Sequence, residues 1–172
     1  MVLTVIKKII HILSYIAYVL IGLYGIVCIP MIFGYKPVVV LSGSMEPTYK
    51  VGSVIYYNKV SKEDLKVGDV ITFTQGNDYV SHRINNIEGD LYETKGDANK
   101  SVDAKKIEYS SIVGRVHKCS IPFIGYYIKF VNENLFIAVI TLIIILIAEF
   151  IFSNIEFNNK KKGEIVNEGS QE

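Results

Sequence analysis

Two long apolar runs on either side of a polar middle constrain this chain more than any other feature. Residues 9–33 contain no charged side chain, and residues 135–152 contain a single one, Glu149. A helix rises about 1.5 Å per residue, so roughly 20 residues cross a hydrocarbon core about 30 Å thick. The 172 residues leave room for one modest domain beside two such helices. We therefore predict two transmembrane helices, at 9–33 and 135–152.

Each run has an alternative interpretation. The first resembles the start of a cleaved secretory signal, because Lys7 and Lys8 precede it. It is, however, much longer than the apolar core of about 7–15 residues in such signals, and no Ala-x-Ala site follows. The second run would have to be enclosed if it were a core helix, and the remaining domain is too small for that. Two uncleaved membrane spans are the better prediction.

Lysines near the spans predict how the chain crosses the membrane. Lys7 and Lys8 precede the first span, and a lysine run at 160–162 follows the second. Cytoplasmic flanks carry the excess of Lys and Arg, so both termini are expected in the cytoplasm. The predicted organisation is a multi-pass protein of the cell membrane. Its parts are an N-terminal lead at 1–8, the two spans, an extracytoplasmic domain at 34–134, and a polar, disordered cytoplasmic tail at 153–172.

The middle segment has the pattern of a mainly β domain. Short β-rich runs alternate with turns that contain glycine, asparagine or aspartate. No stretch has helical periodicity, apart from one possible turn at Ser61–Leu65. We expect one compact domain of the sandwich or barrel kind, with the apolar run Val38–Leu41 buried on both faces. The predicted strands are Val38–Leu41, Ser53–Tyr57, Asp69–Thr74, Tyr79–Ile87, Leu91–Lys95 and Ser111–Val116.

Charge and cysteine content exclude several classes of function. The formal net charge is only +1, which argues against a nucleic-acid partner. Cys28 and Cys119 form no Cys-x-x-Cys pair and have no metal-ligand spacing, so we predict two structural thiols. Nothing in the sequence calls for a metal or a cofactor. Aromatic residues in 121–127 favour the boundary between membrane and water, just before the second span.

The apolar run Val38–Leu41 ends abruptly at Ser42-Gly43-Ser44. A serine after glycine usually serves a turn, and its hydroxyl becomes a nucleophile only with a base in hydrogen-bond reach. His82 and His117 are the histidines of the middle segment, and a histidine on a strand is most often structural. Histidine nevertheless has the right basicity near neutral pH, and it works best when a carboxylate orients it.

Carboxylates occur in the Gly/Asp/Asn-rich loop 96–103, where Asp97 and Asp103 are the candidates. Each of these residues alone has an ordinary explanation as turn structure. Their order along the chain is more specific. Five short boxes together resemble the type I signal peptidases (peptidase family S26). The boxes are Leu41–Thr48, Val67–Phe73, Ser81–Ile84, Lys95–Asn99 and Val113–Val116.

The resemblance implies a membrane-bound serine endopeptidase that cleaves signal peptides from preproteins. The common bacterial type has a lysine as its base, whereas His82 occupies the matching box here. That variant resembles the endoplasmic-reticulum and archaeal type, in which the family brings Ser, His and Asp together. The resemblance implies Ser44 as nucleophile and His82 as base, with either Asp97 or Asp103 behind the histidine. Lys95 is the nearest alternative base.

The resemblance also implies the surroundings of the nucleophile. The Ser44 backbone N–H is one candidate oxyanion donor, and the family's hydroxyl two residues earlier corresponds to Ser42, which equally fits a plain turn residue. Substrates would carry small residues at the first and third positions before the cut, and would bind as an extended strand along Val38–Leu41. Membrane lipid is the other implied partner, and a secretion translocon the implied neighbour.

Two other functions fit parts of the sequence. A non-catalytic membrane module could keep this fold as the partner of a secretion complex, although neither Ser44 nor His82 is missing. A two-span adhesion or transport component is the third possibility. The scarcity of charged residues in both spans argues against a transporter.

Overall fold

The computed structural model describes the backbone of residues 2–168 and the side chains of residues 5–155. The chain divides into two compact units. The first unit combines Met1–Gly25 with Glu133–Glu172, and the second is Ile26–Asn132. The first contains most of the length of the two long apolar helices, and the second contains every strand and every candidate site residue.

Helices α1 (Val2–Cys28) and α3 (Leu135–Glu168) supply the first unit. Two segments are long and apolar enough to cross a membrane, Val5–Phe33 and Leu135–Ile155. The first of them runs past α1 into a short 3₁₀ helix, Ile29–Phe33, which ends where Gly34 adopts a φ of 83°. The left-handed backbone there favours glycine because a Cβ would be crowded.

The prediction of a disordered tail from residue 153 is wrong over most of its length. Helix α3 continues through residues 153–168, and residues 169–172 lie outside the described part of the chain. The segment has no proline to break the helix, and a helix that is already nucleated extends at little cost. Polarity alone was therefore a poor indicator of disorder here.

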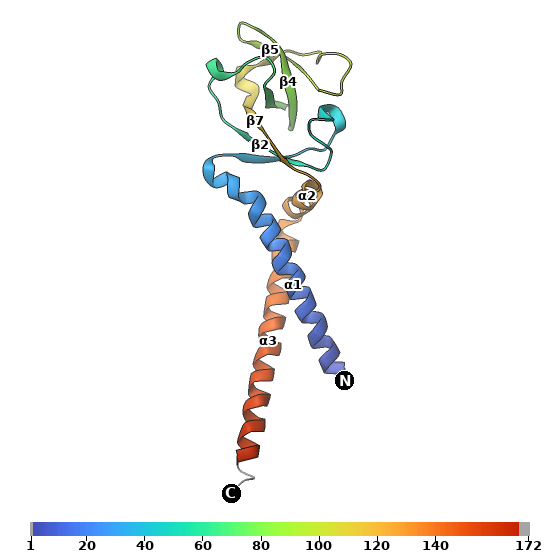
Figure 1. The fold of residues 1–172 in the computed structure, drawn as a ribbon, viewed down its shortest axis with the longest axis vertical. Coiled ribbons are helices and arrows are strands. Elements are labelled where there is room, and N and C mark those ends of the chain that lie inside the picture. Colours follow the sequence, from blue (N-terminus) through green and yellow to red (C-terminus); the bar gives the residue numbers. More distant parts are fainter. Residues whose placement is uncertain (1, 169–172) are drawn as a thin grey trace. The chain divides into compact units, whose positions relative to one another are not determined.

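The second unit is built on a single antiparallel sheet of seven strands. Its order is β1-β2-β7-β3-β4-β5-β6, so β7 returns late in the chain to join β2 to β3. Figure 1 shows this arrangement, with β2 on one side of β7 and with β4 and β5 on the other. The strands are β1 (Lys36–Val39), β2 (Val54–Asn58), β3 (Val70–Gln75), β4 (Asp78–Glu88), β5 (Leu91–Lys95), β6 (Ile107–Glu108) and β7 (Ile112–Ile121).

Register shifts bend the sheet around two hydrophobic clusters. They occur between β2 and β7, between β3 and β7, and between β4 and β5. An extra residue at such a bulge increases the local twist and bends the strand. One cluster contains Met45, Tyr49 and Ile55, and the other contains Phe73 and Tyr92. The mainly β domain is confirmed, and its candidate site lies where the two clusters meet.

The apolar run Val38–Leu41, which overlaps the end of β1, is not buried on both faces as predicted. Strand β1 pairs with β2 alone and stands at the edge of the sheet. Val38 and Val39 are half-buried, and Leu41 is 58% exposed. Burial on both faces occurs one strand further in, in β2. There the Tyr56 hydroxyl donates to the backbone oxygen of Val27 at 3.0 Å, at the end of α1.

The sequence reading missed two elements. Strand β6 has only two residues, which is too short for an alternating pattern. Helix α2 (Gly125–Glu133) begins within the aromatic segment 121–127 that we predicted for the membrane boundary. Phe123, just before it, has a φ of 66° and is 79% exposed. Both cysteines are free thiols, as predicted.

Candidate active site

The Ser44 corner is built by a strand end followed by a tight turn. After β1, the Val40 N–H donates to Ser53 O and extends the pairing with β2. The chain then turns through the 3₁₀ helix Gly43–Met45, and Met45 anchors the turn in the core at 2% exposure. The Ala98 N–H donates to Ser44 O at 2.9 Å. The backbone of Ser44 is thus held from two sides, which leaves its side chain facing β4.

His82 lies opposite Ser44 in the middle of β4 and is 8% exposed. Its Nε2 is 3.1 Å from Ser44 Oγ, and its Nδ1 is 2.6 Å from Asp103 Oδ2. The Phe73 ring meets the imidazole edge to face at 6.3 Å between centroids. One imidazole therefore contacts a hydroxyl through one nitrogen and a carboxylate through the other. This is the arrangement by which a histidine is oriented to take a proton from a serine.

Asp103 is fixed by the strand before it. Its N–H donates to Thr94 O at 2.8 Å, and the Thr94 hydroxyl donates to Asp103 Oδ2 at 2.6 Å. Thr94 is fully buried in β5. The carboxylate oxygen that faces His82 thus also accepts a hydrogen bond from a rigid neighbour. Of the two predicted aspartates, Asp103 is the one in contact with the histidine.

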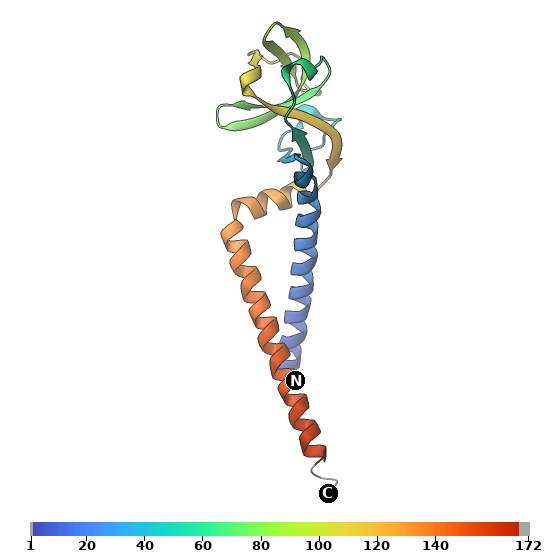
Figure 2. The ribbon, with the colours of Figure 1, turned by 90° about the vertical axis from the view of Figure 1, so that its left-hand side faces the viewer.

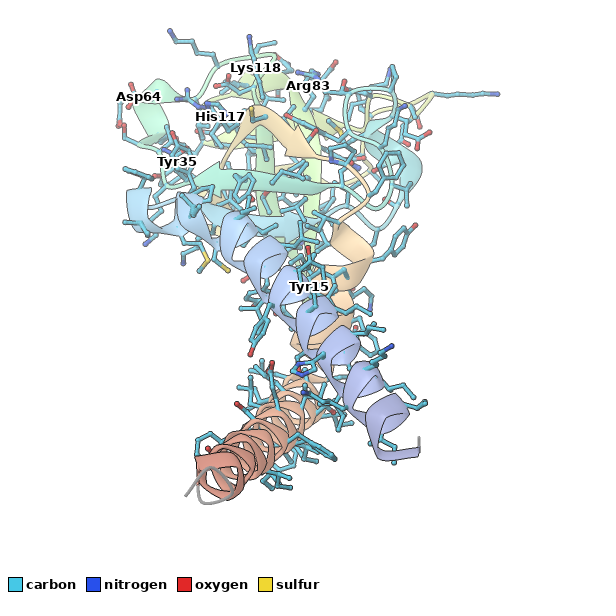
Figure 3. All side chains as sticks on the ribbon, turned by 60° about the horizontal axis from the view of Figure 1, so that its bottom comes forward. Tyr15, Tyr35, Asp64, Arg83, His117 and Lys118 are labelled. Atoms are coloured by element: carbon cyan, nitrogen blue, oxygen red, sulfur yellow. The ribbon has the colours of Figure 1, made fainter. Side chains whose placement is uncertain are left out.

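Asp97 faces a different partner. It accepts two hydrogen bonds from Arg83, from Nε at 2.8 Å and from Nη2 at 2.7 Å, and one from the Thr48 hydroxyl. The Arg83 hydrogen bonds hold the pKa of the Asp97 carboxyl below its usual value, against the opposing effect of burial, and Thr48 adds to the lowering. Asp97 in turn raises the pKa of Arg83. Arg83, labelled in Figure 3, also donates to Gly68 O at 2.7 Å.

The turn that carries Asp97 packs directly against Ser44. A Cβ placed on Gly96 would lie 2.6 Å from Ser44 O and 2.8 Å from the Asn99 side-chain nitrogen. Only a glycine permits this approach, because real Cβ atoms do not come so close to backbone oxygens. The two residues of the Gly-Asp pair therefore contribute differently. Gly96 leaves space for the Ser44 backbone, and Asp97 binds the turn to Arg83.

Two further predicted residues flank the trio of Ser44, His82 and Asp103. Ser42 Oγ lies 3.3 Å from Ser44 Oγ, within hydrogen-bond distance. Lys95 lies opposite Arg83 in the β4–β5 ladder and lines a separate hollow with Arg83 and Asp97. The base position next to Ser44 is filled by His82. Among the described residues, no group of three or more His, Cys, Asp or Glu side chains could hold a metal.

A cleft of about 340 Å³ opens beside Ser44. The end of β1 and the turn after it line one side, and the β3–β4 hairpin lines the other. Half of its lining residues are aliphatic or methionine, and the other half carry hydroxyl, amide or imidazole groups, with Ser44 and His82 among them. Clefts that combine apolar walls with placed polar groups are the usual form of a substrate site. The lining residues are Val38, Val39, Val40, Leu41, Ser42, Ser44, Met45, Tyr49, Ile55, Gln75, Tyr79, Val80, Ser81 and His82.

Comparison with known families agrees with this geometry. The family model described as "Signal peptidase, peptidase S26" matches residues 12–117, which include the whole trio. The chain belongs to the signal peptidase family, S26. The resemblance that the five boxes indicated is confirmed at the level of the family.

Several curated relatives are similar to this S26 chain. Signal peptidase I W of Bacillus subtilis is 43% identical over 89 residues, which cover 48% of this chain and 47% of the relative. The signal peptidase complex catalytic subunit SEC11 of Lodderomyces elongisporus is 39% identical over 112 residues, covering 56% and 66%. SEC11C of Canis lupus familiaris is 29% identical over 110 residues, covering 56% and 57%. The chain thus spans about half to two thirds of the length of these relatives.

The sequence predicted Ser44 and His82 and left Asp97 and Asp103 open as alternatives, but it did not indicate the residues that support the trio. Thr94 and Thr48 gave no separate signal, because a threonine on a strand or in a turn is ordinary. Arg83 lay within the box that identified His82, yet its pairing with Asp97 depends on how the loop folds back. A signal was present in one respect: side chains of consecutive strand residues point to opposite faces, so His82 and Arg83 had to have different partners.

Proposed function

We propose that this protein is a membrane-bound serine endopeptidase that cleaves N-terminal signal peptides from secreted and membrane preproteins at the outer face of the membrane. The observation that carries the proposal is the chain of contacts from Ser44 Oγ through His82 to Asp103, at 3.1 and 2.6 Å. Family membership and relatives named as signal peptidases support the choice of substrate.

The reaction would be an acyl transfer. Ser44 Oγ attacks the scissile carbonyl carbon while His82 Nε2 takes the hydroxyl proton, giving a tetrahedral oxyanion. His82 then gives that proton to the leaving amine, and the C–N bond breaks. A water molecule next attacks the acyl-serine ester, with His82 again as base, and releases the cut signal peptide. Asp103 holds the imidazole in the correct tautomer and stabilises its protonated form.

The oxyanion needs donors that are in place before the reaction. The Ser44 N–H and the Ser42 hydroxyl have this role in the proposal. The Ser42 hydroxyl lies beside Ser44 Oγ, and Ser42 lines the cleft. Removing one donor of this kind typically costs about 10²–10³ in rate.

The substrate would bind as an extended strand beside β1. This strand has one unpaired edge, and its residues line the cleft that contains Ser44. Main-chain hydrogen bonds along such an edge accept many sequences, and specificity then comes from the side-chain pockets. The small residues before the cleavage site, which the family resemblance implied, would fit a cleft of modest volume.

The proposed membrane placement follows from the helices and the lysines. Both candidate spans are apolar enough to cross a bilayer, and the lysines outside them place both termini in the cytoplasm. The second unit would then be extracytoplasmic. Tethering enzyme and precursor to one surface raises the effective concentration of the cleavage site near Ser44.

A non-catalytic role in a secretion complex remains the second candidate; two of the relatives are named as subunits of a complex, although as its catalytic subunits. Purified full-length protein in detergent, mixed with a secretory precursor, separates the two functions. We expect cleavage by the unaltered protein and none by Ser44→Ala or His82→Ala. Cleavage at equal rates by all three proteins contradicts the mechanism, and cleavage by none of them favours the non-catalytic role.

A further inference from the structure

Four polar residues of the two apolar helices gather at one place. The Tyr18 hydroxyl of α1 donates to Glu149 Oε2 of α3 at 2.8 Å, and His11 Nδ1 lies 3.7 Å from Glu149 Oε1. Ser14 lies between Tyr18 and His11 in the sequence and is 1% exposed. Residues 11, 14 and 18 share one face of a helix because they are three and four positions apart. All four residues belong to the first unit.

A stripe of less exposed residues surrounds this cluster on each helix. On α1, Ile10, Ser14 and Ala17 are more covered than their neighbours. On α3 the corresponding positions recur every three or four residues, so they lie on one face of the helix. Figure 2 shows α1 and α3 apart at the start of α3 and closer together further along it. The positions on α3 are Ala138, Leu142, Ile145, Ala148, Glu149 and Phe152.

The cluster lies at a matching depth on the two helices. Tyr18, counted from Phe33, and Glu149, counted from Leu135, are both roughly 20–25 Å along their candidate spans. That depth is inside a hydrocarbon core about 30 Å thick. A carboxyl group in lipid is costly unless other groups of the protein surround it, and such residues face a neighbouring helix.

Close packing of small residues does not explain the pairing. A Cβ added to Gly22 or Gly25 would meet nothing within 4 Å, so these glycines do not bring a second helix near. Apolar side chains gain little free energy when they leave lipid to contact another helix. Different axial registers of two apolar helices therefore have similar free energies. A polar group within an apolar helix–helix contact favours one register, because its hydrogen-bond partners are within reach in that register alone.

We propose that Glu149, with Tyr18 and His11, forms a polar clasp that fixes the register in which α1 and α3 pair within the bilayer. A slip of one helical turn, about 5.4 Å, would leave the Glu149 carboxyl group without its donors. The inference rests on the proposed membrane placement and is independent of peptidase activity. It gives the single ionisable residue of the second apolar run a specific partner on the first.

Cysteine cross-linking in liposomes tests the clasp in the full-length protein. Cys28 and Cys119 are first replaced by serine, and Ala17→Cys is then combined in turn with a cysteine at Leu142, Ile145 or Phe152. We expect one dominant cross-linked pair in the parent protein. With Tyr18→Phe the yield of that pair should fall about threefold, the usual effect of one hydrogen bond between membrane helices. With Glu149→Leu it should fall further and spread to positions a turn away.

Matched controls separate the clasp from general damage. Tyr15→Phe removes the same hydroxyl from a residue that is 70% exposed and is labelled on α1 in Figure 3. Thr141→Val removes a hydroxyl from an exposed position of α3. Both should leave the cross-linking pattern unchanged. An unchanged pattern in Glu149→Leu overturns the proposal whatever the activity, and a redistributed pattern supports it even if the protein cleaves no precursor.

Discussion

His82 and Arg83 are adjacent in β4, and each contacts a different aspartate of the same loop. The two contacts, His82–Asp103 and Arg83–Asp97, differ in kind. His82 is nearly buried and meets Asp103 through a single imidazole nitrogen beside Ser44. Arg83 points the other way, has a side chain 37% exposed, and holds Asp97 through two hydrogen bonds. The first pair is in contact with Ser44. The second pair ties the loop to the strand and to the Thr48 turn.

This difference shows how one short loop can serve two purposes. Side chains of consecutive strand residues alternate between faces, so the loop after β5, which begins opposite Arg83, meets His82 on one face and Arg83 on the other. An arginine–carboxylate fork gives geometric definition, whereas a histidine–carboxylate contact leaves the second ring nitrogen available for proton transfer. We infer that Asp97 positions the loop and that Asp103 belongs to the reacting group.

The largest expected effect is at the nucleophile. Ser44→Ala should lower kcat for precursor cleavage by about 10⁶-fold, because the covalent pathway is lost. Ser42→Ala is the matched control two residues away, and it should lose about 10²-fold through the oxyanion alone. Quantitative cleavage assays in detergent measure both. Equal losses in the two proteins would mean that Ser44 has no special role.

The next effect concerns the turn that joins the two pairs. Gly96→Ala places a Cβ where Ser44 O now lies, so the Ser44 backbone must shift. A displacement of about 1 Å at a reacting group can cost about 10²-fold in rate. We expect kcat to fall by that order, with a smaller change in KM. A protein with unchanged kcat would show that the close approach of Gly96 to Ser44 is unimportant.

A smaller effect should follow at Thr94, which donates to Asp103. Thr94→Val keeps the side-chain shape and removes the hydrogen bond, so kcat should fall about tenfold as the carboxylate loosens. Thr72→Val is a matched control, because Thr72 is equally buried and its hydroxyl pairs with Ser81 instead. Both substitutions should lower the Tm of thermal unfolding, and only Thr94→Val should lower kcat. A similar loss of kcat in both proteins would contradict the role of Thr94.

The smallest effect is a pH dependence of stability at the Arg83–Asp97 pair. Arg83 lowers the pKa of Asp97 in the folded protein. The carboxylate therefore stabilises the fold fully above its usual pKa of 3.8, and the contribution is lost as pH falls through the lower folded value. The difference in Tm between the unaltered protein and Asp97→Asn should be largest near neutral pH and shrink below about pH 4. When Arg83→Gln is present in both proteins, the Tm difference caused by Asp97→Asn should also be smaller. A Tm difference that stays constant across this pH range would count against the pair.

Much of the fold could be predicted from the sequence, because it depends on local patterns. Strand β5 was predicted at its observed bounds, and the apolar runs were found from length and composition alone. The choice between Asp97 and Asp103 could not be predicted. They lie six positions apart in a loop with no regular period, so their directions depend on the path of the chain. The helical continuation of α3 was missed because polar composition says little about a helix that is already nucleated.

The most direct test compares Asp103→Asn with Asp97→Asn in one single-turnover cleavage assay at neutral pH. The account predicts that Asp103→Asn lowers the rate of cleavage about 10⁴-fold, because His82 loses its orienting carboxylate. Asp97→Asn should lower the rate by about tenfold or less and act mainly on thermal stability. Comparable losses in the two proteins, or a larger loss with Asp97→Asn, would contradict the assignment of Asp103 to the reacting group.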